Sequence, residues 1–129
     1  MTLKIDTQIE LNNGVQIPII GLGTWVLNGK EAYNAVSWAL EMDYRLIDTA
    51  TIYGNERKVG KAIKDSGIPR DEVFITTKVW KSDQGYDNTL GALEKSLKKL
   101  GIDYVDLYLI HWPVPGKTLD TWTAMEKIY

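Results

Sequence analysis

The pattern of apolar and polar residues along the chain changes at Pro18. Before this residue, Ile9–Leu11 and Val15–Ile17 are short runs of β-prone residues on either side of Asn12-Asn13-Gly14. An Asn-Gly pair tolerates the positive φ angles of a tight turn. The first 17 residues are therefore predicted to form a β-hairpin.

After Pro18, short apolar runs alternate with stretches in which apolar residues recur at every third or fourth position, as on one face of a helix. The predicted strands are Ile19–Leu22, Arg45–Asp48, Val73–Lys78 and Val105–His111. The predicted helices are Lys30–Met42, Glu56–Ser66, Asp87–Leu100 and a fourth that begins near Leu119 or Asp120. This alternation indicates a parallel sheet whose strands are joined by helical crossovers.

The order of elements, a β-hairpin and then four βα units with parallel strands, predicts an α/β fold that resembles the first half of a (β/α)8 barrel. The predicted strand ends Asp48, Lys78 and His111 are 30 and 33 residues apart. Eight such units would have the length of a complete barrel, about 250 residues. The chain has 129 residues and stops at Tyr129 within its last predicted helix, without a Gly, Asn or Pro stop signal. We therefore interpret residues 1–129 as a single unit that is cut within its fourth helix.

Composition and charge narrow the function classes. The chain carries 15 Lys and Arg against 17 Asp and Glu, a formal charge of −2, and it has no cysteine. Disulfides and thiolate metal sites are thereby excluded, and the near-balanced charge argues against nucleic acid as the main partner. No apolar run approaches the length of about 18 residues that a membrane span needs, and the N-terminus has no signal-peptide pattern. We expect a cytoplasmic protein without a membrane partner.

Three consecutive predicted strands end in titratable residues, namely Asp48, Lys78 and His111. Each follows apolar or small side chains on its own face, and parallel strands bring such ends to one rim, where barrel enzymes hold their catalytic groups. Each residue also has an ordinary structural interpretation: Asp48 in a turn, Lys78 as a solvated strand end, and His111 as a structural histidine. Their coincidence at matching positions shifts the balance toward a functional site, and at this point both interpretations stay open.

Tyr53 lies five residues after Asp48 in a predicted loop, where its side chain can fold back over the same rim. One interpretation is a packed loop aromatic whose hydroxyl meets water, and the other is a proton donor. A phenol donates protons poorly at neutral pH unless a cation stabilises the phenolate. Lys78 would supply that cation and Asp48 would hold it in place, so the chemistry requires a chain of acid, lysine and tyrosine.

Glycine and tryptophan residues also gather at the predicted rim. The segment Gly21-Leu22-Gly23-Thr24-Trp25 follows the first strand but lacks the third glycine and the immediate helix of a dinucleotide-binding fingerprint. Trp25, Trp80 and Trp112 each fall just beyond a predicted strand. We interpret them as walls of an apolar pocket, with a covered cluster of loop aromatics as the alternative.

Four motifs in order resemble the aldo-keto reductase family, and within it the bacterial branch that acts on small substrates. They are Gly21-Leu22-Gly23-Thr24-Trp25, Asp48-Thr49-Ala50 through Tyr53-Gly54-Asn55-Glu56, Ile75-Thr76-Thr77-Lys78, and Asp106-Leu107-Tyr108-Leu109-Ile110-His111-Trp112-Pro113. The resemblance runs from the hairpin to Tyr129. It implies an NADPH-dependent enzyme that reduces aldehydes or ketones to alcohols by hydride transfer.

The resemblance also implies a role for each residue at the rim. Tyr53 would be the general acid, Lys78 the cation that stabilises its phenolate, and Asp48 the partner of that lysine. His111 would orient the substrate carbonyl through a hydrogen bond from a neutral ring, and no metal would be needed. The implied substrate-binding residues are Trp25, Trp80, His111 and Trp112, and the implied cofactor-binding residues are Gly23, Thr24 and Asp48.

In the family that these motifs resemble, most of the NADPH site belongs to the second half of the barrel. We therefore expect the 129-residue chain alone to bind NADPH weakly or not at all and to be inactive, with a small carbonyl compound as the substrate of a longer form. Two alternatives stay open. The chain is a catalytically silent half-barrel that self-associates through its exposed sheet edges, or it is an open α/β binding module. The second alternative leaves the coincidence of Asp48, Tyr53, Lys78 and His111 unexplained.

Overall fold

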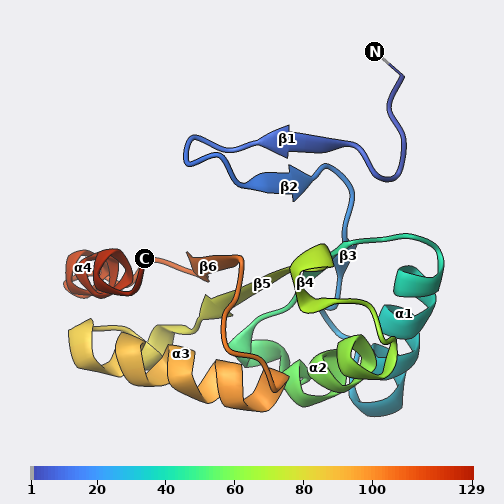
Figure 1. Cartoon of the computed structure of the whole chain (residues 1–129). Coiled ribbons are helices and arrows are strands. Elements are labelled where there is room, and N and C mark those ends of the chain that lie inside the picture. Colours follow the sequence, from blue (N-terminus) through green and yellow to red (C-terminus); the bar gives the residue numbers. More distant parts are fainter. Residues whose placement is uncertain (1) are drawn as a thin grey trace.

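The computed structural model describes residues 2–129, within which six strands, four α-helices and three short 3-10 turns are formed (Figure 1). The strands are β1 (Gln8–Glu10), β2 (Gln16–Pro18), β3 (Leu22–Gly23), β4 (Leu46–Asp48), β5 (Phe74–Val79) and β6 (Leu107–Ile110). The helices are α1 (Gly29–Glu41), α2 (Glu56–Asp65), α3 (Tyr86–Leu100) and α4 (Thr118–Ile128), and the 3-10 turns are Thr51–Tyr53, Arg70–Glu72 and Lys81–Asp83. Within this range, no helix combines the length and the apolar character that crossing a bilayer requires.

Strands β1 and β2 form the predicted antiparallel hairpin, with Ile9 opposite Ile17. The N–H of Leu11 donates to the carbonyl of Val15 (2.8 Å), and Gly14 has a φ of +82°, which residues with a Cβ rarely adopt. In Figure 1 the hairpin (blue) lies on the opposite side of the parallel sheet from helices α2 and α3. The turn chemistry in the sequence therefore predicted this element correctly.

The other four strands form one parallel sheet in the order β3-β4-β5-β6, which is also their order in the sequence. This arrangement confirms an α/β fold in which a hairpin precedes successive parallel βα units. Among residues 2–129, β3 and β6 are the two edges of the sheet, and each has a strand neighbour on one side. The sheet is therefore open, as expected for half of a barrel.

The first predicted strand, Ile19–Leu22, is displaced, because the sheet contains Leu22–Gly23 instead. The N–H of Ile19 donates to the carbonyl of Thr7 (3.1 Å), which ties this residue to the hairpin. Gly21 lies against β4, where an added Cβ would approach the Leu46 side chain to 2.0 Å. The residues before Leu22 therefore serve as a tight connection between the hairpin and the sheet.

The fourth predicted strand, Val105–His111, is paired as a strand over Leu107–Ile110. Just before this strand, the N–H of Asp106 donates to the carbonyl of Ile75 (3.0 Å), and the carboxylate of Asp106 accepts the N–H of Ile75 (2.8 Å). The same carboxylate forms an ion pair with Arg70 (2.7 Å). A side chain thus supplies one of the two hydrogen bonds between Asp106 and Ile75, next to the paired part of the strand.

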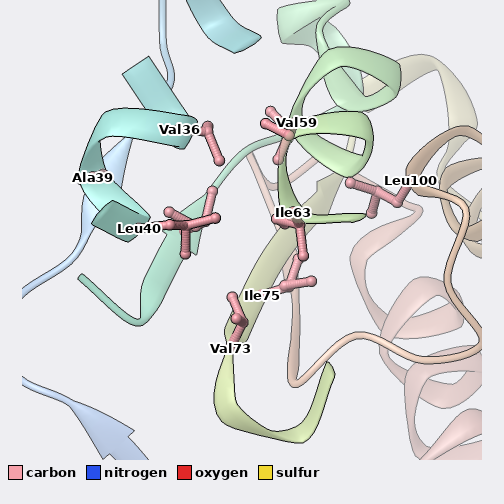
Figure 2. Close-up of a cluster of buried hydrophobic side chains, with 10 residues drawn as sticks. Val36, Ala39, Leu40, Val59, Ile63, Val73, Ile75 and Leu100 are labelled. Atoms are coloured by element: carbon pink, nitrogen blue, oxygen red, sulfur yellow. The ribbon is translucent and has the colours of Figure 1, made fainter. Parts of the chain in front are cut away.

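The hydrophobic core lies between the sheet and helices α1 and α2 (Figure 2). Ile47 and Ile75, from the middle of β4 and from β5, are fully buried on the side that faces these helices. The whole cluster consists of Val36, Ala39, Leu40, Ile47, Val59, Ala62, Ile63, Val73, Ile75 and Leu100. Because side chains alternate along a strand, Asp48 and Lys78 point to the face away from this core.

Helix α2 and the end of α3 approach each other at Gly60, where an added Cβ would lie 1.9 Å from the carbonyl oxygen of Leu100. Gly60→Ala is therefore expected to lower the free energy of unfolding by about 1–3 kcal/mol, because the two backbones must separate. Urea unfolding followed by circular dichroism measures this change.

Gly91→Ala is the matched control for Gly60→Ala. Gly91 lies inside α3, where an added Cβ would meet no atom within 4 Å. Alanine is the better helix former, so this variant is expected to gain about 0.5–1 kcal/mol. Equal stability changes in the two variants would contradict the close approach at Gly60.

Candidate active site

The ends of the central strands place the predicted titratable residues on one face of the sheet. Asp48 is paired in register with Thr76, and Lys78 is paired with Leu109. Lys78 therefore lies two residues farther along β5 than the partner of Asp48, and His111 lies two residues beyond Leu109. This stagger sets the three side chains at successive levels along the rim, and the long lysine side chain spans the difference.

Lys78 and Asp48 form an ion pair, in which Nζ lies 2.5 Å from Oδ1. The ammonium also donates to the carbonyl oxygen of Thr49 (2.9 Å). The Lys78 side chain is only 12% exposed, so the interpretation of a solvated strand end is wrong. Because an ammonium has three N–H donors, one of them is left for a further group.

Tyr53 ends the 3-10 turn Thr51–Tyr53, which follows β4 after two residues. Gly54 then adopts a φ of +68°, and this left-handed residue redirects the chain into α2. The local structure places Tyr53 over the rim, because Nζ of Lys78 lies 5.1 Å from the centre of its ring. The ring centre of His111 is 5.6 Å away from that of Tyr53. The structure thus brings together the residues that the sequence predicted as an acid, a lysine and a tyrosine.

His111 stands edge-on between two aromatic rings, those of Tyr53 (80° between planes) and Trp80 (77°). Burial lowers the pKa of His111 below its ordinary value, and the charge of Lys78 lowers it further against the opposing effect of Asp48. These surroundings therefore favour the neutral form of the imidazole. Its Nδ1 is buried and has no hydrogen-bond partner within residues 2–129. Nε2 is consequently the nitrogen that can donate a hydrogen bond to a ligand.

The three predicted pocket tryptophans occupy different places at the rim. The ring of Trp25 lies 4.9 Å from that of Tyr53, and the ring of Trp80 lies 5.3 Å from that of His111. These two rings flank the titratable groups. The carbonyl of Trp112 accepts a hydrogen bond from Nε2 of Gln84 (2.6 Å), and Trp112 is 57% exposed. Its role as a pocket wall stays a prediction.

The predicted cofactor positions Gly23, Thr24 and Asp48 lie at the adjacent ends of β3 and β4. Gly23 is paired in register with Asp48, and an added Cβ on Gly23 would meet no atom within 4 Å, so the rim is open there. Thr24 is fully buried, and its N–H and its hydroxyl both donate to the carbonyl of Asp48 (3.0 Å each). Thr24 therefore ties the two strand ends together and keeps its hydroxyl inside the structure.

Sequence reasoning assigned no role to a layer of buried polar residues behind the rim. The hydroxyl of Thr49 donates to the carboxamide oxygen of Asn55 (2.7 Å), and the hydroxyl of Thr77 donates to the carboxylate of Glu56 (2.8 Å). Both threonines are chain neighbours of the ion pair. In the sequence, Asn55 and Glu56 at a helix start look like ordinary capping residues, so no local signal distinguishes them.

Comparison with known proteins places these features in one family. The model of the Aldo/keto reductase family matches residues 19–129. A glyoxal reductase from Bacillus subtilis (strain 168) is 54% identical over 130 residues, which cover 100% of this chain and 47% of that protein. The fold and the rim thus define about half of a (β/α)8 barrel, and the chain belongs to the aldo/keto reductase family.

Solved structures agree with this assignment. A crystal structure of an aldo-keto reductase from a Medee basin deep-sea metagenome has a TM-score of 0.92 and 58% identity, and the match covers 94% of this chain and 45% of that chain. The Bombyx mori aldo-keto reductase, solved in complex with NADP, has a TM-score of 0.88 and 39% identity over 97% of this chain and 47% of that chain. The chain spans about half the length of the relatives it matches.

His111 is the only histidine in the sequence, so a single imidazole Cε1–H resonance reports its titration. We expect a titration midpoint below 6.5, because burial and the charge of Lys78 disfavour the protonated ring. Lys78→Met should move the midpoint up, and Asp48→Asn should move it down. A midpoint at or above 6.5 in the unsubstituted chain would contradict a neutral ring held by its surroundings.

The lowered pKa of His111 also predicts how the stability of the fold changes with pH. When the pKa of a base is lower in the folded state than in the unfolded state, its contribution to stability is complete at a pH above the pKa of the unfolded state. This contribution is lost as the pH falls toward the pKa of the folded state. Between about pH 7.5 and about pH 5, the urea midpoint of the wild type should therefore fall more than that of His111→Gln.

Proposed function

We propose that this chain carries the catalytic residues of an NADPH-dependent reductase that converts an aldehyde or a ketone into an alcohol. One observation carries this proposal: Tyr53, the Lys78–Asp48 ion pair and the neutral His111 converge at one rim of a parallel sheet. The homologues are aldo-keto reductases, one of which is a glyoxal reductase, and this supports carbonyl reduction.

The rim fits part of a nicotinamide cofactor. Gly23 leaves open space beside Asp48, whose side chain is 31% exposed. A carboxylate accepts hydrogen bonds from sugar hydroxyls, so we assign Asp48 and the backbone of Gly23 to the nicotinamide ribose, and the buried Thr24 supports these two strand ends from behind. The Bombyx mori structure with NADP supports this cofactor, and the rest of the site is assigned to the part of the relatives that this chain does not span. When bound, the reduced nicotinamide supplies the hydride.

Tyr53 supplies the proton in this proposal. As the carbonyl is reduced, its oxygen gains negative charge and takes the proton of the Tyr53 hydroxyl. Lys78 stabilises the phenolate that is left, since its charge lies 5.1 Å from the ring centre, and Asp48 keeps the ammonium in position. His111 donates a hydrogen bond from Nε2 to the same oxygen and so orients the carbonyl.

The aromatic rings around these groups support a small substrate. Trp25 and Trp80 stand on the two sides of Tyr53 and His111. Tryptophan rings bury apolar parts of a ligand and exclude water from the reacting oxygen. We therefore propose a small aldehyde or ketone with an apolar substituent as the substrate class, with Trp112 as the third wall.

Tyr53→Phe is expected to lower the rate of carbonyl reduction about 100- to 10,000-fold, because it removes the proton donor and little else. Binding of NADPH should be retained. The assay follows NADPH oxidation by a fusion of residues 1–129 with the part of the Bacillus subtilis glyoxal reductase that has no counterpart in this chain.

Tyr86→Phe is the matched control, since Tyr86 is an exposed tyrosine at the start of α3. It should leave turnover unchanged. The 129-residue chain alone should show no NADPH-dependent turnover, because most of the cofactor site is assigned elsewhere. Substantial turnover by Tyr53→Phe would refute the proposed acid, and turnover by the chain alone would refute the proposed division of the cofactor site.

A second candidate, proposed for the isolated chain, is a catalytically silent half-barrel that self-associates. Strands β3 and β6 present backbone groups along one side without a strand partner in the described residues. The helices that follow them carry exposed apolar residues, namely Trp38 (59%) on α1 with Met42 (60%) at its C-cap, and Leu119 (77%) and Trp122 (54%) on α4. Two copies that pair β6 with β3 would form an eight-stranded sheet and cover these side chains.

The native mass of the isolated chain is therefore expected to equal two chains of 14.6 kDa each. Trp122→Glu should shift this mass to that of one chain, because a charge would be buried at the new contact. Leu3→Glu is the control, since Leu3 is 66% exposed in the segment before the hairpin. A single chain at every concentration would overturn the self-association proposal.

A further inference from the structure

Asn55 occupies the N-cap position of α2 but does not cap the helix. Asparagine is among the best N-cap residues because its side chain accepts a hydrogen bond from the first turn. The Asn55 side chain makes no such bond, and the residue is only 1% exposed. Because this carboxamide is buried and does not cap the helix, its hydrogen bonds are made to groups outside the first turn of α2.

Two of these hydrogen bonds are made to the loop between β3 and α1. Nδ2 of Asn55 donates one hydrogen bond to the carbonyl of Thr24 (2.9 Å) and another to the carbonyl of Leu27 (2.8 Å). Its carboxamide oxygen accepts the hydroxyl of Thr49 (2.7 Å). Both amide hydrogens are therefore committed to the two ends of one turn, residues 24–27.

This turn is strained. Val26 has a φ of +60°, a left-handed conformation that is a genuine outlier for a β-branched residue. The turn is closed by a single bond, from the N–H of Leu27 to the carbonyl of Thr24 (3.2 Å). Val26 is 72% exposed, so packing does not hold it. Thr24 at the start of the turn is also tied to the carbonyl of Asp48, and the bond from Asn55 to the carbonyl of Leu27 fixes the other end from inside.

The turn carries Trp25, whose ring lies 4.9 Å from that of Tyr53 at an interplanar angle of 52°. In the third hydrogen bond of Asn55, its carboxamide oxygen accepts the hydroxyl of Thr49. The carbonyl oxygen of Thr49 in turn accepts a hydrogen bond from the ammonium of Lys78. One buried side chain thus connects the aromatic wall of the rim with the strand end that holds the lysine.

We propose that Asn55 is a positioning residue: by holding the strained 24–27 turn, it keeps Trp25 against Tyr53 and so sets the affinity for the carbonyl substrate. This inference rests on the proposed function of the rim, and it adds to it a specificity-determining residue that touches neither substrate nor cofactor. Without the two donor bonds, the turn relaxes and Trp25 leaves the pocket, while Tyr53 and Lys78 stay in place.

The test uses the 129-residue chain labelled with fluorotryptophan. The five tryptophans give five ¹⁹F resonances, which single Trp→Phe variants assign. Asn55→Asp replaces both amide hydrogens by an acceptor that faces two carbonyls. We expect it to shift or broaden the Trp25 resonance and to leave those of Trp38 and Trp122 unchanged. Exchange of the Leu27 amide hydrogen should become about tenfold faster or more.

Asn28→Asp is the matched control, because Asn28 is the exposed N-cap of α1 and also makes no side-chain capping bond. It should leave the Trp25 resonance unchanged. Thr49→Val removes the third bond of Asn55 but keeps both donors, so Trp25 should again stay in place. If Asn55→Asp does not fold, Asn55→Ser is used instead, because serine cannot make both donor bonds. It should also shift or broaden the Trp25 resonance. An unchanged Trp25 resonance in a folded Asn55 variant would overturn the proposal.

Kinetic measurements on the fusion of residues 1–129 with the Bacillus subtilis glyoxal reductase segment separate this inference from the proposed function. Asn55→Asp should raise KM for an aldehyde about tenfold and change kcat less, because the proton donor keeps its place. Equal losses in kcat and kcat/KM would overturn the assignment to substrate affinity. If the unsubstituted fusion folds but reduces no carbonyl compound, the proposed function fails, and the ¹⁹F spectra still decide whether Asn55 positions Trp25.

Discussion

The ion pair between Lys78 and Asp48 joins two neighbouring strands at the rim, and the rest of the site is arranged around it. A lysine that is 12% exposed needs a carboxylate close by, since an unpaired ammonium is costly to bury. Because the pair connects β4 with β5, its geometry depends on the register of these strands. Ile47 and Ile75 fix that register from the opposite face, where they pack against the helices. Apolar packing on one side of the sheet thus determines the electrostatics on the other side.

The sequence was sufficient for those features that depend on local chemistry. Alternation and turn residues predicted the hairpin, the parallel βα units and the shared face of Asp48 and Lys78, because each of these follows from residues close together in the chain. The displaced first strand was not predictable in this way, since it depends on a hydrogen bond between Ile19 and Thr7 across the hairpin. The burial of Lys78 was also not predictable, because periodicity indicates which face a side chain lies on but not which residues cover it.

The polar residues behind the rim show why a site cannot be deduced from its reactive groups alone. Thr49 and Thr77 point away from the rim, and each donates its hydroxyl to a residue at the start of α2. In the chain, Asn55 and Glu56 look the same whether they cap a helix or support a neighbouring strand. Only the three-dimensional contacts show that they support the strands.

The residues of the proposed chemistry all come from the stretch between Asp48 and His111, and they meet across adjacent strands. A genetic exchange with its crossover outside this stretch would bring in new loops without separating the proton donor from its lysine or from the orienting imidazole. The proposed reaction is therefore inherited together with Trp80 and Asn55, whereas the pocket residues Trp25 and Trp112 lie outside this stretch. A module of this kind can be combined with different flanking segments without loss of the contacts between its reactive groups.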